Sequence, residues 1–196
     1  MILAPQNEAA DTARVEEQYA KYQKELNAAT EKQTAQTTAL EKEASALSSK
    51  YYKQFSAYQK NVGKFDHDKA QTKLVKEDLK AGTGETITDD TSYAVYYIGW
   101  LPNGTIFDGS IDGKKLKTPF VARPSGTISG WAEGAKGMKI GGVRMLTIPS
   151  EQGYGATGQG DIPANTPLRF VLMPIRVVET IKQPEVPAEL LQSYGG

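Results

Sequence analysis

The side chains that usually carry covalent or acid–base chemistry are scarce in this chain. It contains no cysteine and one histidine, His67. Disulfides, thiol chemistry, cysteine-ligated metals, a histidine-based triad and a multi-histidine metal centre are therefore excluded. Aromatic and aliphatic residues instead lie beside glycine and proline through the second half of the sequence. This combination favours a pocket that binds an apolar ligand over one that transfers protons.

Two local patterns imitate functional motifs. Residues 153–158 read GYGATG and match the glycine spacing of dinucleotide-binding loops. Such a loop must open a helix, and residues 159–163, QGDIP, are poorly suited to do so, which argues against nucleotide binding. The triplet Asp66-His67-Asp68 resembles a metal cluster. Consecutive residues on a helix do not face one another, so we interpret the triplet as a solvated helix end.

Charge and composition narrow the possible partners. The chain has 196 residues, and its 23 Lys and Arg are balanced by 23 Asp and Glu. This balance offers no positive field for a polyanion, so we expect no nucleic-acid partner. No apolar run approaches the roughly 20 residues of a membrane span. The absence of cysteine and a start that could be the stub of a removed anchor favour the cell envelope, with the cytoplasm as the alternative.

Glycine and proline divide the chain sharply. Neither residue occurs between Pro5 and Gly63. Residues 7–62 are rich in Ala, Glu, Gln and Lys, which favour helix. Their larger side chains recur every three or four positions and form one helical stripe. The stripe consists of Val15, Tyr19, Tyr22, Leu26, Leu40, Ala44, Leu47, Tyr51, Phe55, Tyr58 and Val62.

Two structures fit this stripe. One is a single helix of about 55 residues, and the other is a helical hairpin that turns within residues 27–38. The absence of glycine and proline from that stretch favours the single helix. A helix this long cannot bury its own stripe. We expect it either to act as an arm for dimerisation or spacing, or to dock on the chain's own second domain.

The rest of the chain has an α+β pattern. Runs rich in β-branched and aromatic residues predict strands at 93–98, 143–148 and 168–178. The sequence PNG at 102–104 is a hairpin-turn signal, and the glycine-bounded stretch 130–138 predicts one short helix. Antiparallel strands with a single short helix are typical of an α+β domain.

These patterns divide the chain into three parts. We expect a helical arm over residues 1–70, a domain over 71–181 and a tail over 182–196. The tail contains prolines and is expected to be extended, apart from a possible turn at 188–191.

Short motifs within residues 72–180 occur in the order and near the spacing of FKBP-type peptidyl-prolyl cis-trans isomerases, and the chain resembles that family. The motifs are YYIG at 96–99, IFDGS at 106–110, ISGW at 128–131, LTIP at 146–149, YGATG at 154–158, IP at 162–163 and LRF at 168–170. The family fold is a curved antiparallel sheet wrapped around one short helix, with the active pocket between them. The resemblance therefore implies this fold, preceded here by the helical arm.

The resemblance also implies an apolar pocket for a proline ring. Trp131 would form the floor, and Tyr97, Phe107 and Phe170 would form aromatic walls. Further lining would come from Thr127, Ile128 and Ile162.

Polar groups at the rim of this pocket would bind the substrate backbone. The backbone N–H of Ile128 and the hydroxyl of Tyr154 would donate to substrate carbonyl groups. Asp108 would sit at the edge, within reach of Tyr97 or the substrate. Tyr97, Asp108, Trp131 and Tyr154 are thus the expected catalytic residues.

The implied activity needs no cofactor or metal. Rotation about an X–Pro bond faces a barrier of roughly 18–20 kcal/mol, because amide resonance is lost in the twisted state. A dry aromatic pocket penalises the planar amide more than the less polar twisted one. The resemblance implies proline-containing protein substrates and a role in folding. It also raises macrolide inhibitors and a homodimer through the arm as expectations. A catalytically weak binding or chaperone module is the alternative.

One stretch departs from the family pattern. Residues 111–118 are slightly long, whereas 120–126 are short and lack the expected second aromatic–aliphatic strand. We therefore expect an altered rim over 111–127, and Phe120 stays outside the expected site.

Overall fold

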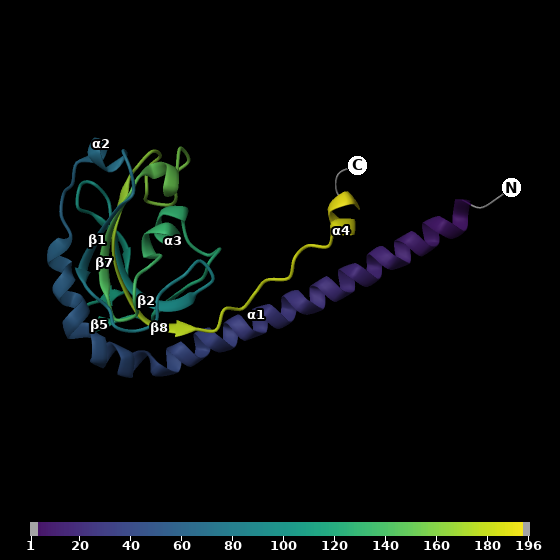
Figure 1. Ribbon diagram of the computed structural model, residues 1–196, viewed down its shortest axis with the longest axis horizontal. Coiled ribbons are helices and arrows are strands. Elements are labelled where there is room, and N and C mark those ends of the chain that lie inside the picture. The colour runs from purple at the N-terminus through teal and green to yellow at the C-terminus, as the bar shows by residue number, and fades with distance from the viewer. Residues whose placement is uncertain (1–3, 194–196) are drawn as a thin grey trace. The chain divides into compact units, whose positions relative to one another are not determined.

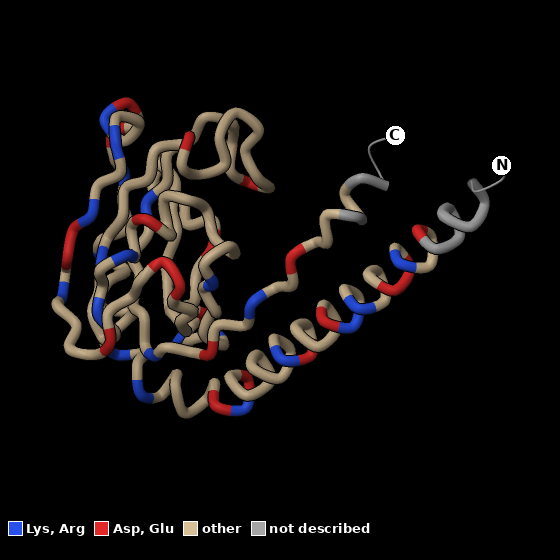
Figure 2. Tube along the Cα trace, turned by 45° about the vertical axis from the view of Figure 1, so that its right-hand side comes forward, with Lys and Arg blue, Asp and Glu red and all other residues tan. Residues whose placement is uncertain are grey.

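The computed structural model describes residues 4–193. One helix, α1, runs without interruption from Ala4 to Ser56, and a 3-10 turn, η1, follows over Ala57–Asn61. The prediction of a single helix is confirmed, and the hairpin alternative is wrong. Basic and acidic residues are interspersed along α1 (Figure 2), at positions between those of the apolar stripe.

The described chain falls into two compact units. One comprises the described residues before 40 together with those after 180, and the other comprises residues 40–180. In the first unit Tyr19 is 50% exposed, whereas Ala29 and Leu190 are buried. The tail contains a short helix, α4, at Ala188–Ser193, where the sequence predicts a turn. Among the described helices, none is long and apolar enough to cross a membrane.

The second unit is built on an antiparallel sheet (Figure 1). The strand order is β1-β7-β8-β2-β3, and β6 also pairs with β2. The strands are β1 (Val75–Lys80), β2 (Ser92–Trp100), β3 (Ile106–Gly109), β6 (Phe120–Ala122), β7 (Val143–Ile148) and β8 (Leu168–Val178). A separate small hairpin is formed by β4 (Ile111–Asp112) and β5 (Lys115–Leu116). Besides the end of α1 and the turn η1, this unit contains the short helical segments α2 (His67–Ala70), α3 (Ser129–Ala135) and η2 (Ser150–Gln152).

The two faces of the sheet carry separate cores. Successive side chains of a strand point to opposite faces. On β2, Val95 packs in the core that contains Trp131, whereas its neighbour Tyr96 packs in the core that contains Leu40 and Phe55 of α1. We call the face that packs on Trp131 the inner face and the face that packs on α1 the outer face. The inner face holds α3, and the outer face holds the last turns of α1.

Polar contacts also fix α1 on the outer face. Glu43 of α1 forms an ion pair with Arg176 of β8 at 2.7 Å. The segment just after η1 is held as well, since the indole N–H of Trp100, on β2, donates to the carbonyl of Gly63 at 3.1 Å. The part of the stripe from Leu40 onward therefore docks on the domain, as the second of the two sequence-based alternatives expects.

Two glycines let α3 approach the inner face closely. A Cβ atom at Gly130 would lie 2.3 Å from Cγ2 of Ile148, and one at Gly134 would lie 2.5 Å from Cδ1 of Leu146. Both distances are too short for a Cβ atom unless the facing side chain or α3 itself moves. This close contact sets the position of Trp131, which lies between the two glycines in sequence and is only 4% exposed.

Candidate active site: an aromatic cup on the inner face

Four aromatic rings meet on the inner face of the sheet. The ring centroid of Trp131 lies 5.0 Å from that of Phe170 and 5.3 Å from that of Tyr97. The centroids of Phe107 and Phe170 are 5.6 Å apart. All three pairs meet edge to face, a geometry that adds about 0.5–1.5 kcal/mol per pair beyond apolar burial. We call these four residues the aromatic cup.

A glycine on β2 allows two walls of the cup to touch. Gly99 is paired with Asp108 of β3 on one side and with Phe170 of β8 on the other. A Cβ atom at Gly99 would lie 2.7 Å from both Cζ of Phe107 and Cε1 of Phe170. The two rings therefore meet above the backbone of this glycine, which explains the residue in the YYIG motif.

Phe120, which lies outside the site expected from the sequence, belongs to the same group of rings. Its centroid lies 5.9 Å from that of Tyr97 and 6.1 Å from that of Trp131. Phe120 begins the short strand β6, in which it is paired with Val95 of β2. The alternation of Phe120 with the buried Val121 was the available signal, but a run of three residues is too short to show a period.

A short hydrogen-bond chain lies at the rim of the cup. The hydroxyl of Tyr97 donates to Oδ2 of Asp108 at 2.5 Å, and the N–H of Gly109 donates to Oδ1 at 2.7 Å. Burial raises the pKa of Tyr97, and the hydrogen bond and negative charge of Asp108 raise this pKa further. Tyr97 is therefore a neutral donor at physiological pH, and Asp108 holds the orientation of its hydroxyl.

Two further donors are available near this chain. Tyr154 follows η2, and burial together with the charge of Asp108 raises its pKa, so its hydroxyl keeps its proton. Within residues 4–193, neither the Tyr154 hydroxyl nor the backbone N–H of Ile128 has a hydrogen-bond partner. Tyr154 and Ile128 are half-buried against the inner core, in which Ile162 is buried. Thr127 is half-buried next to Ile128, and the described structure gives it no hydrogen bond to the cup.

The indole of Trp131 has a buried partner that is not among the residues expected from the sequence. Its N–H donates to the hydroxyl oxygen of Tyr93 at 3.0 Å, and Tyr93 is 4% exposed. Burial raises the pKa of Tyr93 to about 12, although the bond from Trp131 opposes the shift. Tyr93, Val95 and Tyr97 alternate on β2 and share the inner face. This period-two placement was the signal that could have identified Tyr93.

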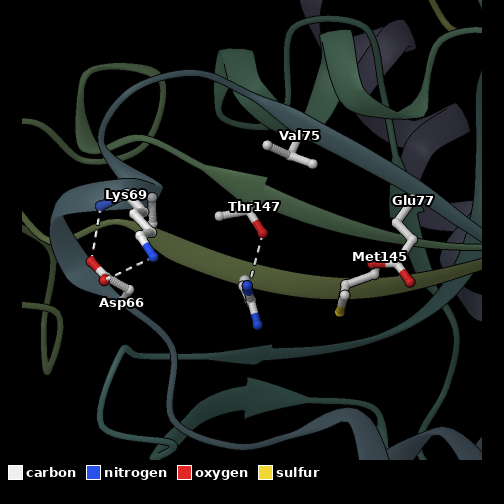
Figure 3. Close-up of a pocket in the computed structure, with 8 residues that line it drawn as sticks. Asp66, Lys69, Val75, Glu77, Met145 and Thr147 are labelled. Atoms are coloured by element: carbon white, nitrogen blue, oxygen red, sulfur yellow. Dashed lines mark hydrogen bonds and ion pairs between the residues drawn. The ribbon is translucent and has the colours of Figure 1, made fainter.

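A different cavity, of about 200 Å³, lies away from the cup (Figure 3). Its lining includes Thr147 and Arg169, which are paired across β7 and β8. The adjacent residues Leu146 and Phe170 belong to the inner core, so this cavity opens on the opposite face. The Nε of Arg169 donates to Oγ1 of Thr147 at 3.0 Å, and its guanidinium lies over the ring of Phe65.

The structure also shows where the two imitating motifs lie. Residues 153–158 form turns that no helix follows within the described chain before α4. Asp66 caps α2 by accepting from the N–H of Lys69 at 3.0 Å. His67 does contact its neighbour, since Nδ1 lies 3.0 Å from Oδ1 of Asp68. Both side chains are exposed to solvent, which agrees with a solvated helix end.

Comparisons with known proteins concern this same unit. The family model of the FKBP-type peptidyl-prolyl cis-trans isomerases matches residues 83–173. An FK506-binding protein of Neisseria meningitidis serogroup A is 45% identical over 107 residues, which cover 54% of this chain and 97% of the relative. FK506-binding protein 4 of Rhizopus delemar is 41% identical over 98 residues, which cover 50% of this chain and 25% of the relative.

Among solved structures, that of FkpA from Escherichia coli is 32% identical with a TM-score of 0.50. The match covers 74% of this chain and 63% of that one, so it extends beyond the range of the family model. The relatives, the sheet packed on a single short helix and the aromatic cup between them agree with one another. The chain belongs to the FKBP-type peptidyl-prolyl cis-trans isomerases and carries a long N-terminal helix in addition to the isomerase domain.

Proposed function

We propose that the aromatic cup binds the proline ring of an X–Pro peptide bond and that this binding accelerates rotation about the bond. The observation that supports this proposal is the meeting of four aromatic rings around Trp131. Their edge-to-face packing offers an apolar surface of fixed shape to a pyrrolidine ring. Ile162 completes this surface on the inner face.

Catalysis follows from the polarity of the two states. The planar amide has separated charge because of resonance, and the twisted amide has lost most of it, at a barrier of roughly 18–20 kcal/mol. An apolar cup destabilises the charge-separated planar amide more than the less polar twisted amide. The free-energy barrier to rotation is therefore lower in the cup than in water. None of the cup residues has to exchange a proton with the substrate.

The donors at the rim would hold the substrate backbone. The free N–H of Ile128 and the hydroxyl of Tyr154 are suited to bind the carbonyl groups on either side of the rotating bond. Asp108 would act by orienting Tyr97, because both of its oxygens already accept hydrogen bonds. Thr127 would contact the substrate next to Ile128.

The substrates are proposed to be proline-containing segments of unfolded or extended proteins, and the chain would assist their folding. Several relatives are named FK506-binding proteins. We infer that macrolides of the FK506 type compete with proline for the cup, with an affinity that depends on Phe120 and the rest of the rim.

The first half of α1 is proposed to form a homodimer. The stripe residues Val15, Tyr22 and Leu26 are only half-buried, and Tyr19 is 50% exposed. A second copy of the same stripe would cover them. Sedimentation of the full chain tests this: Tyr19→Glu together with Leu26→Glu should convert a dimer to a monomer, and a monomeric wild-type protein would contradict the proposal.

The isomerase proposal is tested with a proline-containing tetrapeptide whose cis and trans forms exchange slowly enough to follow by NMR. The wild-type chain should accelerate the exchange. Tyr154→Phe should lower kcat/KM about tenfold, because one hydrogen bond between uncharged groups of the enzyme and the substrate is lost. An intact, folded chain that binds proline peptides without accelerating the exchange would leave a binding or chaperone module as the function.

A further inference from the structure

A large concave surface lies between the last turns of α1 and the β4–β5 hairpin. Its volume is about 600 Å³, three times that of the cavity in Figure 3, and all of its lining residues belong to the unit 40–180. The helix contributes Ser45, Ser49 and Lys53, and the hairpin side contributes Lys114 and Lys117. We call this surface the lysine groove.

The groove has fixed walls. The backbone N–H of Leu116 donates to Oγ of Ser48 at 2.8 Å, and both residues are buried. The hydroxyl of Tyr52 donates to the carbonyl of Gly113 at 3.3 Å. Because these bonds hold the hairpin against α1 before any ligand arrives, little conformational entropy is lost when one binds.

The charge of the groove is unbalanced. Four lysines line it against the single carboxylate of Asp112, and that carboxylate lies 3.5 Å from the ammonium of Lys115. Within residues 4–193, the ammonium groups of Lys53, Lys114 and Lys117 have no carboxylate within 4 Å. The chain as a whole has zero formal charge, so this is a local positive field, which attracts an anionic ligand.

One cavity borders both the groove and the rim of the candidate active site. Lys117 also lines a neighbouring cavity, and Phe107 and Asp108 line that same cavity. Phe107 is a wall of the aromatic cup, and Asp108 is the rim carboxylate that binds Tyr97. Ile98, which lines the same cavity, belongs to the outer core. A chain bound in the cup would therefore pass over the edge strand β3 at Asp108 to reach the lysine groove.

We propose that the lysine groove binds an acidic segment of the same polypeptide whose proline occupies the cup. Asp and Glu side chains would meet the three unpaired ammonium groups, and the exposed hydroxyl groups of the helix wall would add polar contacts. A concave groove between a helix and a hairpin fits an extended peptide better than a flat membrane surface. This inference rests on the proposed function, and it makes clients with Asp and Glu near a proline the preferred substrates.

The experiment compares two peptides that share one X–Pro core. One has a run of Asp and Glu joined to the core by a flexible Gly/Ser spacer, and the other has Asn and Gln in their place. Short and long spacers are used on each side of the proline. At low salt, the acidic peptide should show a kcat/KM about three- to tenfold higher than its neutral counterpart, and 0.5 M NaCl should remove about all of that preference.

Substitution of the groove lysines should abolish the preference. The triple variant Lys53→Gln, Lys114→Gln, Lys117→Gln is expected to treat the two peptides alike and to keep wild-type kcat/KM for the neutral one. Equal values for the two peptides on the wild-type protein would overturn the proposal. So would a preference that survives in the triple variant.

A matched variant controls for the loss of charge. Lys73→Gln, Lys80→Gln, Lys139→Gln removes the same number of exposed lysines outside the groove and should keep the preference. If no peptide were isomerised, the proposed function would fail. Binding of acidic peptide by the groove would then be tested separately, by the fluorescence anisotropy of a labelled, proline-free acidic peptide. Tighter binding of a single-stranded oligonucleotide of equal charge at the groove lysines would overturn the assignment of a polypeptide ligand.

Discussion

Two neighbouring tyrosines of β2 separate activity from packing. Tyr97 faces the cup and donates to Asp108, whereas Tyr96 is fully buried on the outer face. The Tyr96 hydroxyl has no hydrogen-bond partner among the described residues. A buried hydroxyl without a partner costs free energy that folding does not recover. The tyrosine hydroxyl is therefore expected to support activity at position 97 and to lower the stability of the fold at position 96.

This contrast gives a paired prediction. Tyr97→Phe should lower kcat/KM about tenfold, because this variant lacks the hydroxyl group that Asp108 orients at the rim of the cup. Tyr96→Phe should leave kcat/KM unchanged and raise the free energy of unfolding by up to about 1 kcal/mol. Urea unfolding and the peptide isomerisation assay measure the two quantities. An equal loss of activity in both variants would show that the hydroxyl of Tyr97 has no particular role.

The buried Tyr93 makes stability depend on pH above the neutral range. Its pKa in the folded chain is about 12, above the value of about 10 in an unfolded chain. The folded state thus favours the protonated form, and this contribution is complete below pH 10 and is lost as the pH rises toward 12. Wild-type protein should lose about 2–3 kcal/mol over this range through Tyr93.

Tyr93→Phe isolates this contribution from that of the other tyrosines. The variant should show a smaller loss of unfolding free energy between pH 10 and 12 than the wild type. At neutral pH it should be about 1–3 kcal/mol less stable, because the indole N–H of Trp131 loses its buried acceptor. Urea unfolding at each pH measures both effects, and superimposable profiles for the two proteins would contradict the assignment.

At the scale of elements, the position of the cup depends on how closely α3 approaches β7. A Cβ atom at Gly130 would overlap Ile148 at 2.3 Å. Gly130→Ala should therefore lower the free energy of unfolding by about 1–3 kcal/mol and also lower kcat/KM, since Trp131 moves with α3. Gly126→Ala is the matched control: its nearest neighbour would lie at 3.5 Å, so both quantities should stay near wild type.

The sequence predicts the strands of the central sheet well because packing and local preference agree there. The strands predicted at 143–148 and 168–178 have the observed bounds of β7 and β8, and β2 extends the predicted 93–98 by only a few residues. These runs are rich in β-branched and aromatic residues. The edge strand β1 reads VKEDLK and is almost wholly exposed, so it carries no pattern by which to find it.

In the candidate site, too, residues on elements with a clear sequence pattern are predicted and the others are missed. The motifs around Tyr97 and Trp131 locate the cup, because each lies on an element that the sequence also predicts. Phe120 and Tyr93 are missed for physical reasons: Phe120 lies on the three-residue strand β6, and Tyr93 acts through a hydrogen bond to Trp131 that only the folded chain reveals. The lysine groove combines residues of α1 and of the hairpin that are far apart in sequence.

For the whole molecule, the division into an arm over 1–70, a domain over 71–181 and a tail over 182–196 remains a prediction. The compact unit 40–180 includes the last turns of α1, whose Leu40 and Phe55 are buried in the outer core. These helix residues therefore stabilise the isomerase domain, whatever the first half of α1 does.

Two deletions test this prediction. A chain without residues 1–39 should fold and keep wild-type kcat/KM on a short peptide. A chain without residues 1–70 should unfold at a lower urea concentration, because it lacks the buried side chain of Phe55. Loss of one large buried aromatic side chain lowers the free energy of unfolding by about 3–5 kcal/mol. Equal stability of the two truncated chains would mean that the helix contributes nothing to the domain.

The two tryptophans allow the most direct measurement of the central claim. Trp131 forms the floor of the cup, whereas Trp100 is fully buried on the outer face. NMR exchange rates of an X–Pro peptide would be compared for the wild type, Trp131→Leu and Trp100→Phe, each shown to be folded by circular dichroism. We predict that Trp131→Leu loses at least about tenfold in kcat/KM and that Trp100→Phe keeps the wild-type value. Wild-type catalysis by a folded Trp131→Leu protein would contradict the claim that the aromatic cup is the isomerase site.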